Sequence, residues 1–189
     1  GGRAERLRDA LLRTWYNKED RSNTETVRRN ALESLAFFGS QDAVVAAIHQ
    51  AYEDPSTTLR AGALSAMGTT FDPRWHSLVL QELRNPEPEL RFEAARAAGA
   101  LEIEQAVPRL FEMVLDPDQE VRAMAIAALG SIGGKAAKTA LMSLLQSPDQ
   151  SVQEAAEDAL IELEFNEDPM NVSRILERFR ASAERNHTD

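Results

Sequence analysis

The sequence contains no cysteine, only 6% aromatic residues and no long apolar run. Without cysteine the chain has no disulfide framework, no zinc–thiolate site and no thiol nucleophile. No apolar stretch approaches the roughly 20 residues that a membrane-spanning helix needs. Only three histidines are present and none precedes a glutamate, so a site of several converging His and carboxylate ligands is not expected. The sequence therefore predicts no catalytic residue, no metal, no cofactor and no membrane contact.

Acidic residues outnumber basic ones, 31 to 21, so the net charge is −10 and the sequence pI is about 4.9. Residues 151–189 carry ten acidic residues against four arginines. A phosphate backbone needs a basic footprint, so nucleic acid is not expected as a partner. We take the opening pair Gly1-Gly2 as a cloning remnant, with the native N-terminus absent, and cytoplasmic as the default location.

A polar residue followed by proline recurs at an interval of 31 residues, and an aliphatic residue follows each proline at the fourth position. The pairs are Asp54-Pro55, Asn85-Pro86, Asp116-Pro117 and Ser147-Pro148, and the aliphatic residues are Leu59, Leu90, Val121 and Val152. Self-similarity at such a period is typical of a stacked repeat array. In such an array each repeat buries its apolar face only against its neighbours.

Each repeat is predicted to be a helical hairpin. In the best repeat we expect Asp116 to be the N-cap, with Pro117 at the first helical position and Gln119 bonding back to the cap. Glycines at 130, 133 and 134 are expected to end this helix, and a second helix is expected at about 135–146. The spacing of apolar residues predicts these core positions: Val121, Ala125, Leu129, Ala137, Leu141, Leu144 and Leu145.

The neighbouring repeats follow the same pattern. In the first repeat, Ser22 and Glu25 are expected to form a capping box. The predicted core there is Val27, Ala31, Leu35, Val44, Ile48 and Tyr52; in the second repeat it is Leu59, Ala63, Met67, Trp75, Val79 and Leu83; in the third it is Leu90, Ala94, Ala98, Ala106, Leu110 and Val114. The predicted organisation is an N-terminal capping helix or truncated repeat (1–21), a repeat array (22–168), and a C-terminal capping helix and tail (169–189), with the last helix at about 169–185.

The motif DPDQEVR at 116–122, its relative NPEPELR at 85–91 and AIAALG at 125–130 resemble the HEAT repeats, most of all the short type named after phycobilisome lyases. The resemblance covers about residues 22–180. It implies an all-α, right-handed superhelix of about five hairpins plus an N-terminal helix, with the second helices on the concave side. It also implies a structural ladder of recurring arginines and acids in adjacent turns: Arg28, Arg60, Arg91 and Arg122 with Glu87, Asp118 and Asp149.

Such an array is expected to serve as a non-enzymatic scaffold or regulatory module that binds a protein or helical peptide on its concave face. Aligned second helices give the candidate partner-binding residues Gln50, Glu53, Trp75, Gln81, Arg84, Glu112, Leu115, Ser143 and Gln146. Two questions stay open at this point. Leu80, Phe111 and Met142 are either core or an exposed apolar stripe, and Trp75 either fills a wide turn or projects as a hot spot.

Two other functions remain as alternatives. Relatives named after bilin lyases would handle a tetrapyrrole, and such a subunit would use basic and aromatic residues: Trp75, His76, Arg84, Arg109 and Phe111. A purely structural spacer, or an array that self-associates through its end repeats, is the second alternative. Light scattering and pigment binding would separate these functions from a scaffold.

Overall fold

The computed structural model describes residues 2–171 and 177, and every regular element in that part of the chain is a helix. None of these helices combines the length and apolar character that a bilayer span requires. The chain divides into two compact units, Gly1–Ile103 and Glu104–Asp189. Each unit is described by itself below.

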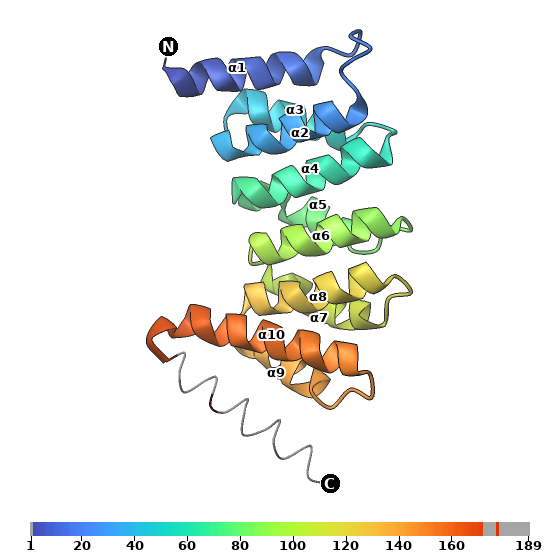
Figure 1. The fold of residues 1–189 in the computed structure, drawn as a ribbon, viewed down its shortest axis with the longest axis vertical. Coiled ribbons are helices and arrows are strands. Elements are labelled where there is room, and N and C mark those ends of the chain that lie inside the picture. Colours follow the sequence, from blue (N-terminus) through green and yellow to red (C-terminus); the bar gives the residue numbers. More distant parts are fainter. Residues whose placement is uncertain (1, 172–176, 178–189) are drawn as a thin grey trace. The chain divides into compact units, whose positions relative to one another are not determined.

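The first unit consists of successive helices that pack against their neighbours in the sequence (Figure 1). The elements are α1 (Arg3–Tyr16), α2 (Glu25–Leu35), η1 (Ala36–Phe38), α3 (Asp42–Tyr52), α4 (Thr57–Thr70), η2 (Pro73–Trp75), α5 (His76–Glu82) and α6 (Pro88–Ala100). Helices α2, α4 and α6 pack side by side in sequence order, α3 packs on α4, and α5 packs on α6. The α2, α4 and α6 row forms the first-helix surface of this unit, and α3 and α5 form its second-helix surface.

The second unit repeats this arrangement. Its elements are η3 (Glu104–Ala106), α7 (Val107–Glu112), η4 (Met113–Leu115), α8 (Gln119–Ile132), α9 (Gly134–Leu144), α10 (Gln150–Glu167) and η5 (Pro169–Asn171). Helices α8 and α10 pack against each other, and α9 packs on both of them. The final helix predicted at 169–185 mostly lies outside the described residues, and its first three residues form η5.

The predicted apolar stripes of the second, third and fourth repeats are buried, apart from the half-buried Leu145. The first repeat departs from its prediction at two positions: Val27 is 42% exposed and Tyr52 is half-buried. The N-cap of α2 is Thr24, whose hydroxyl accepts from the Val27 amide at 3.3 Å, and not Ser22. Helix α2 therefore starts later than predicted, and Val27 lies in its first turn.

The recurring polar residue before proline was predicted to be the N-cap, and this prediction is wrong. The residue instead stabilises the turn before the helix. Asp116 Oδ1 accepts from the amide of Asp118 at 3.0 Å, and Asp118 is the residue that caps α8. The equivalent hydrogen bond, from a backbone amide to the side-chain oxygen two residues before it, forms in the other three turns. The amides of Ser56, Glu87 and Asp149 donate to Asp54, Asn85 and Ser147. Such a side chain can bond the backbone two residues on, so the proline sits in the turn and the helix starts after it.

Glycine in this repeat serves close packing more than helix termination. Gly130 lies inside α8, where an added Cβ would approach the carbonyl oxygen of Ala159 on α10 to 2.8 Å. The helix ends instead at Gly133, whose φ of 67° suits glycine. The prediction that Gly130 helps to end the helix is therefore wrong, and the prediction for Gly133 is confirmed.

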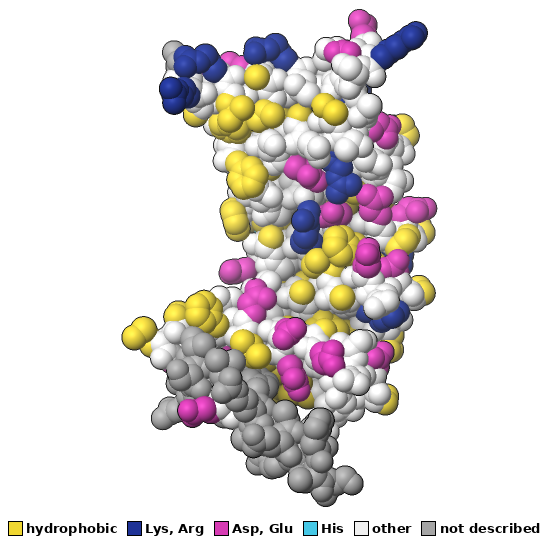
Figure 2. All heavy atoms as spheres, in the orientation of Figure 1, with side chains coloured by type: hydrophobic (Ala, Val, Ile, Leu, Met, Phe, Trp, Pro, Cys, Tyr) yellow, Lys and Arg dark blue, Asp and Glu magenta, His cyan; other side chains and the backbone are white. Residues whose placement is uncertain are grey.

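Charge is distributed differently over the first-helix surfaces of the two units. Figure 2 shows acidic and basic side chains mingled over α4 and α6 of the first unit, and mainly acidic side chains over α8 and α10 of the second. Residues 104–168 hold thirteen acidic and four basic residues. The negative charge of the protein is therefore concentrated in the second unit.

Candidate functional site

In the first unit, four of the predicted partner-binding residues are exposed on or directly after the second helices. Gln50 and Glu53 belong to the end of α3, and Gln81 and Arg84 to the end of α5. The side-chain oxygen of Gln50 accepts a hydrogen bond from Trp15 Nε1 at 3.0 Å, so this glutamine also fixes the indole of α1. The other three side chains present polar groups to solvent along this surface.

Trp75, a predicted partner-binding residue, is not at the surface, because its side chain has no exposed area. Its ring lies against His49, with ring centroids 4.7 Å apart and the planes tilted by 56°. Within the described residues its Nε1 donor has no hydrogen-bond partner. Trp75 therefore fills the turn between α4 and α5, and the hot-spot interpretation is wrong for this residue.

In the second unit, three predicted residues come together around one hollow of about 560 Å³. Leu115, Ser143 and Gln146 line it together with Phe111. Its floor is formed by the buried side chains of Val114, Leu144 and Val152. The rest of the lining comes from Arg122 and from turn residues: Asp116, Ser147, Pro148 and Asp149. The fourth predicted residue of this unit, Glu112, is exposed on α7 and pairs with Arg109 at 3.0 Å.

The apolar column that the sequence left open is mostly exposed. Met142 is 54% exposed and Phe111 42%, whereas Leu80 of the first unit is half-buried. Leu115, one of the predicted partner-binding residues, is 88% exposed. Phe111 and Leu115 lie four residues apart on consecutive helical segments, so both reach the same hollow. The second unit thus presents large apolar side chains to solvent on its second helices, and such exposure on a folded surface is typical of an interaction site.

The carboxylate of Glu82, which is 3% exposed, was not predicted to be buried. It accepts hydrogen bonds from Tyr52 Oη at 2.7 Å, Asn85 Nδ2 at 2.6 Å and Arg60 Nη2 at 3.3 Å. Burial, followed by the bond to Glu82 and its charge, raises the pKa of Tyr52 to about 12. One signal existed: the equivalent repeat positions hold Ala51, Met113 and Leu144, so a charge at 82 interrupts an apolar column.

The recurring arginines of the third and fourth repeats make equivalent contacts, whereas Arg28 of the first repeat makes different ones. Arg28 stacks 4.6 Å from the centre of the Trp15 ring and donates to the Trp15 carbonyl at 3.0 Å. Arg91 donates to the carbonyls of Asn85 and Pro86, at 2.9 and 2.8 Å. Arg122 donates to those of Asp116 and Pro117, at 2.7 and 3.3 Å.

The acids of the predicted ladder act first as parts of turns and caps. Asp118 and Asp149 cap α8 and α10, and Glu87 is the N-cap residue of α6. Hydrogen bonds from Ser151 hold the pKa of Asp149 below its usual value, and the charge of Arg122 contributes in the same direction. An arginine–acid ladder between repeats stays a prediction.

Across the described residues, no three His, Asp or Glu side chains come together in a way that could hold a metal ion. The polar side chains that do cluster take part in helix caps, in turns and in the hydrogen bonds to Glu82. The arrangement offers exposed apolar side chains beside polar rims, which is the chemistry of a binding surface.

Comparison with known proteins relates part of the chain to a repeat family and the fold to several solved structures. A profile for HEAT repeats matches residues 77–161, whereas no curated protein sequence matches the chain significantly. An engineered protein is similar at a TM-score of 0.57 and 20% identity, covering 84% of this chain and 79% of that protein. The complex of CpcE and CpcF of phycocyanin lyase from Nostoc sp. PCC7120 is similar at a TM-score of 0.62 and 21% identity. The match covers 82% of this chain and 64% of that chain. The Pds5–Scc1 complex is similar at a TM-score of 0.56 and 14% identity, and the match covers 88% of this chain and 30% of that chain. These likenesses show an all-α solenoid fold of the kind that HEAT and armadillo repeats form, and the stretch 77–161 matches the HEAT repeats.

Proposed function

We propose that this chain is a non-enzymatic scaffold that binds a partner protein or helical peptide on its second-helix surfaces. The observation that carries this proposal is the hollow beside Leu115, a leucine that is 88% exposed and has buried apolar residues below it. Leaving such a side chain in water gains nothing for the fold, whereas burying it under a partner is favourable by about 2 kcal/mol.

The composition of the hollow supports a protein partner. Its centre is apolar, through Phe111, Leu115 and the floor, and its edge carries the polar groups of Ser143, Gln146 and Asp149. An apolar centre with a polar rim is the usual anatomy of a protein interface. Two of the similar structures are themselves complexes between proteins, CpcE with CpcF and Pds5 with Scc1. The hollow would accept one or two apolar side chains of a partner helix.

The test is affinity capture from a native lysate with the wild-type chain and two variants. Leu115→Asp places a charge in the hollow, and Leu7→Asp places the same charge on α1, where Leu7 is 57% exposed. We expect the recovery of the captured protein to fall about tenfold or more with Leu115→Asp and to be unchanged with Leu7→Asp. Equal recovery with all three proteins, or none above the bead control, would contradict the proposal.

A bilin-lyase-type subunit is the second candidate, favoured by the structural likeness to the CpcE and CpcF complex. At 21% identity this likeness supports the fold alone, and Trp75, an aromatic residue that such a site would use, is buried. Titration with phycocyanobilin is the direct measurement. We expect no absorbance shift and no gain in melting temperature, and either change would favour the lyase-type function.

A spacer or self-associating array is the third candidate. Its measurement is light scattering over a range of concentrations. We expect a constant mass, and a mass that rises with concentration would favour self-association over a scaffold for other proteins.

A further inference from the structure

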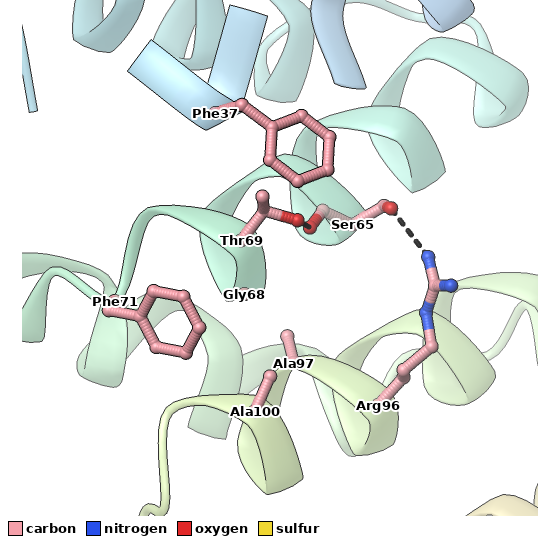
Figure 3. A pocket seen from close by; sticks show the side chains of 8 residues that line it. All are labelled: Phe37, Ser65, Gly68, Thr69, Phe71, Arg96, Ala97 and Ala100. Carbon is pink, nitrogen blue, oxygen red and sulfur yellow. Dashed lines mark hydrogen bonds between the residues drawn. The ribbon is translucent and has the colours of Figure 1, made fainter. Parts of the chain in front are cut away.

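A second hollow lies on the first-helix surface of the first unit and is independent of the surface proposed above. It has a volume of about 370 Å³ and is bounded by η1, α4 and α6. Its lining residues are Phe37, Ser65, Gly68, Thr69, Phe71, Arg96, Ala97 and Ala100. Figure 3 shows the rings of Phe37 and Phe71 on two sides of the hollow, with the small residues of α4 and α6 between them. We call it the phenylalanine groove.

The floor of the groove is fixed by a close approach of two helices. A Cβ added to Gly68 would lie 3.1 Å from Cα of Ala97, so α4 and α6 almost touch at this point. Ala97 is buried and Ala100 is exposed, and neither side chain is large enough to fill the space above the contact. A shallow apolar trough therefore runs over the helix pair.

Phe71 is the feature that folding alone does not explain. Its φ is +54°, the left-handed conformation, which costs a non-glycine residue roughly 1–2 kcal/mol. Two positions at the same spacing in later repeats, Glu102 and Gly133, also have a positive φ, of 51° and 67°, so this position of the repeat favours glycine. The Phe71 ring is nevertheless 75% exposed, so burial returns little of the cost.

Phe37, across the groove, is 82% exposed. Together the two rings leave roughly 300 Å² of aromatic surface in water. A patch of this size is typical of a binding site on a monomer, but it is well below the roughly 800 Å² that each partner contributes to a stable protein–protein interface. The area therefore favours a short segment of a partner protein over a second copy of this chain.

One edge of the groove is polar. Arg96 Nη2 donates to the hydroxyl oxygen of Ser65 and pairs with Glu93 Oε2 at 2.8 Å, as the dashed line in Figure 3 marks for Ser65. The Arg96 side chain is 47% exposed, and no described residue accepts a hydrogen bond from its Nη1. Guanidinium groups carry five donors, so Nη1 can bind a carbonyl oxygen of a peptide laid in the groove.

We propose that the phenylalanine groove is a second docking site, which binds a short peptide segment of a partner protein. One large apolar side chain of the segment inserts between Phe37 and Phe71, over Gly68 and Ala97. A backbone carbonyl of the segment accepts a hydrogen bond from Arg96 Nη1. The strained, exposed Phe71 is kept for this contact and not for the fold.

The probe is a phage-displayed library of random peptides of roughly 12 residues, a length that fits the usual modes of peptide recognition. Selected peptides are synthesised and their affinities for four proteins are measured by fluorescence polarisation. The proteins are the wild type, Phe71→Gly, Phe37→Ser and Leu115→Asp. Leu115→Asp leaves the groove intact and separates this proposal from the one above, because it affects only the second unit.

We expect peptides with a leucine, methionine or aromatic side chain, whose affinity falls about tenfold or more with Phe71→Gly and with Phe37→Ser and is unchanged with Leu115→Asp. Phe71→Gly is also expected to melt at the wild-type temperature or higher, because glycine relieves the backbone strain. Peptides that bind all four proteins equally, or selection of none, would overturn the proposal. A lower melting temperature for Phe71→Gly would show that the ring serves the fold, and sedimentation of a wild-type dimer that Phe71→Gly disrupts would assign the groove to a second copy.

Discussion

The side chain of Arg29 crosses α4 at Gly62 and reaches Glu93 on α6. Arg29 Nη2 lies 3.0 Å from Glu93 Oε1, and a Cβ added to Gly62 would lie only 2.7 Å from Arg29 Cγ. The same guanidinium pairs with Glu89 at 3.0 Å and with Glu33 at 2.9 Å. One arginine thus joins α2 to α6 across the helix between them, and it can do so because α4 carries no side chain at the crossing.

This crossing predicts that Gly62→Ala destabilises the protein although alanine is the better helix former. The new Cβ must displace the Arg29 side chain and with it the pair to Glu93, which is only 5% exposed. Loss of part of this network outweighs the roughly 1 kcal/mol that alanine gains over glycine in a helix. We expect the free energy of unfolding in urea to fall by about 1 kcal/mol.

The control for this prediction is the same substitution in an Arg29→Ala background. Without the arginine there is nothing for the Cβ to displace, so Gly62→Ala should then stabilise the protein by about 1 kcal/mol. The sign of the effect therefore reverses between the two backgrounds. The same sign in both would show that Arg29 and Gly62 are not coupled.

The period of 31 residues was enough to predict the helical hairpins and most of their core, because burial within each repeat follows a local spacing. The predicted helix starts were wrong, because a residue such as Asp116 can bond either the first turn of a helix or the turn before it. Arg29 and Glu82 were missed because their partners lie in other repeats, up to 64 positions away, and spacing within one repeat cannot show them.

The residues that line the two hollows were predicted only in part. Leu115, Ser143 and Gln146 do meet at one hollow, because aligned second helices place equivalent positions on one surface. Trp75 was misplaced because the size of a side chain does not reveal whether its turn has room for it. Phe71 carried an unused signal: it stands 31 residues before Glu102 and 62 before Gly133, at a position where φ is positive.

Tyr52 should make the stability of the protein depend on pH in the alkaline range. Burial raises the pKa of Tyr52 to about 12 in the folded protein, above the value of about 10 for an unfolded chain. The folded state therefore holds the phenolic proton more tightly. The contribution of Tyr52 is complete below pH of about 10 and is lost as the pH rises toward 12.

The variant Tyr52→Phe isolates this effect. At neutral pH it loses one hydrogen bond to the Glu82 carboxylate and should be less stable by about 2 kcal/mol. The difference between the wild type and Tyr52→Phe should shrink between pH 10 and 12 in urea unfolding, and absorbance at 295 nm should follow the ionisation. A difference that does not change with pH would mean that Tyr52 does not titrate with folding.

Gly130 should not tolerate even a methyl group. A Cβ at this position would lie 2.8 Å from the carbonyl oxygen and 3.1 Å from Cα of Ala159, and these are backbone atoms that can move only with α10. Overpacking of this kind costs about 1–3 kcal/mol. We expect Gly130→Ala to lower the melting temperature clearly, whereas Ser131→Ala, at the next position of α8, should change it little. Equal melting temperatures for Gly130→Ala and the wild type would show that α8 and α10 are not in close contact at this point.

In the third and fourth repeats the recurring arginine should act mainly through the backbone carbonyls of the preceding turn. Arg122 Nη1 donates to the carbonyls of Asp116 and Pro117. In the last repeat Gln153, at the equivalent position, donates through Nε2 to the carbonyl of Ser147. A neutral amide can therefore take the place of the guanidinium.

The glutamine at the equivalent position of the last repeat suggests a matched pair of variants, Arg122→Ala and Arg122→Gln. Arg122→Ala leaves both carbonyls without their donor and should lower the free energy of unfolding by about 2 kcal/mol, whereas Arg122→Gln should retain at least half of that stability. If instead a ladder of charges between repeats is what matters, Arg122→Gln should lose as much as Arg122→Ala, because both remove the positive charge near Asp149. The loss should then also diminish at high salt, since exposed charges are screened. Urea unfolding of the three proteins at 0.1 M and 1 M NaCl decides between the two explanations.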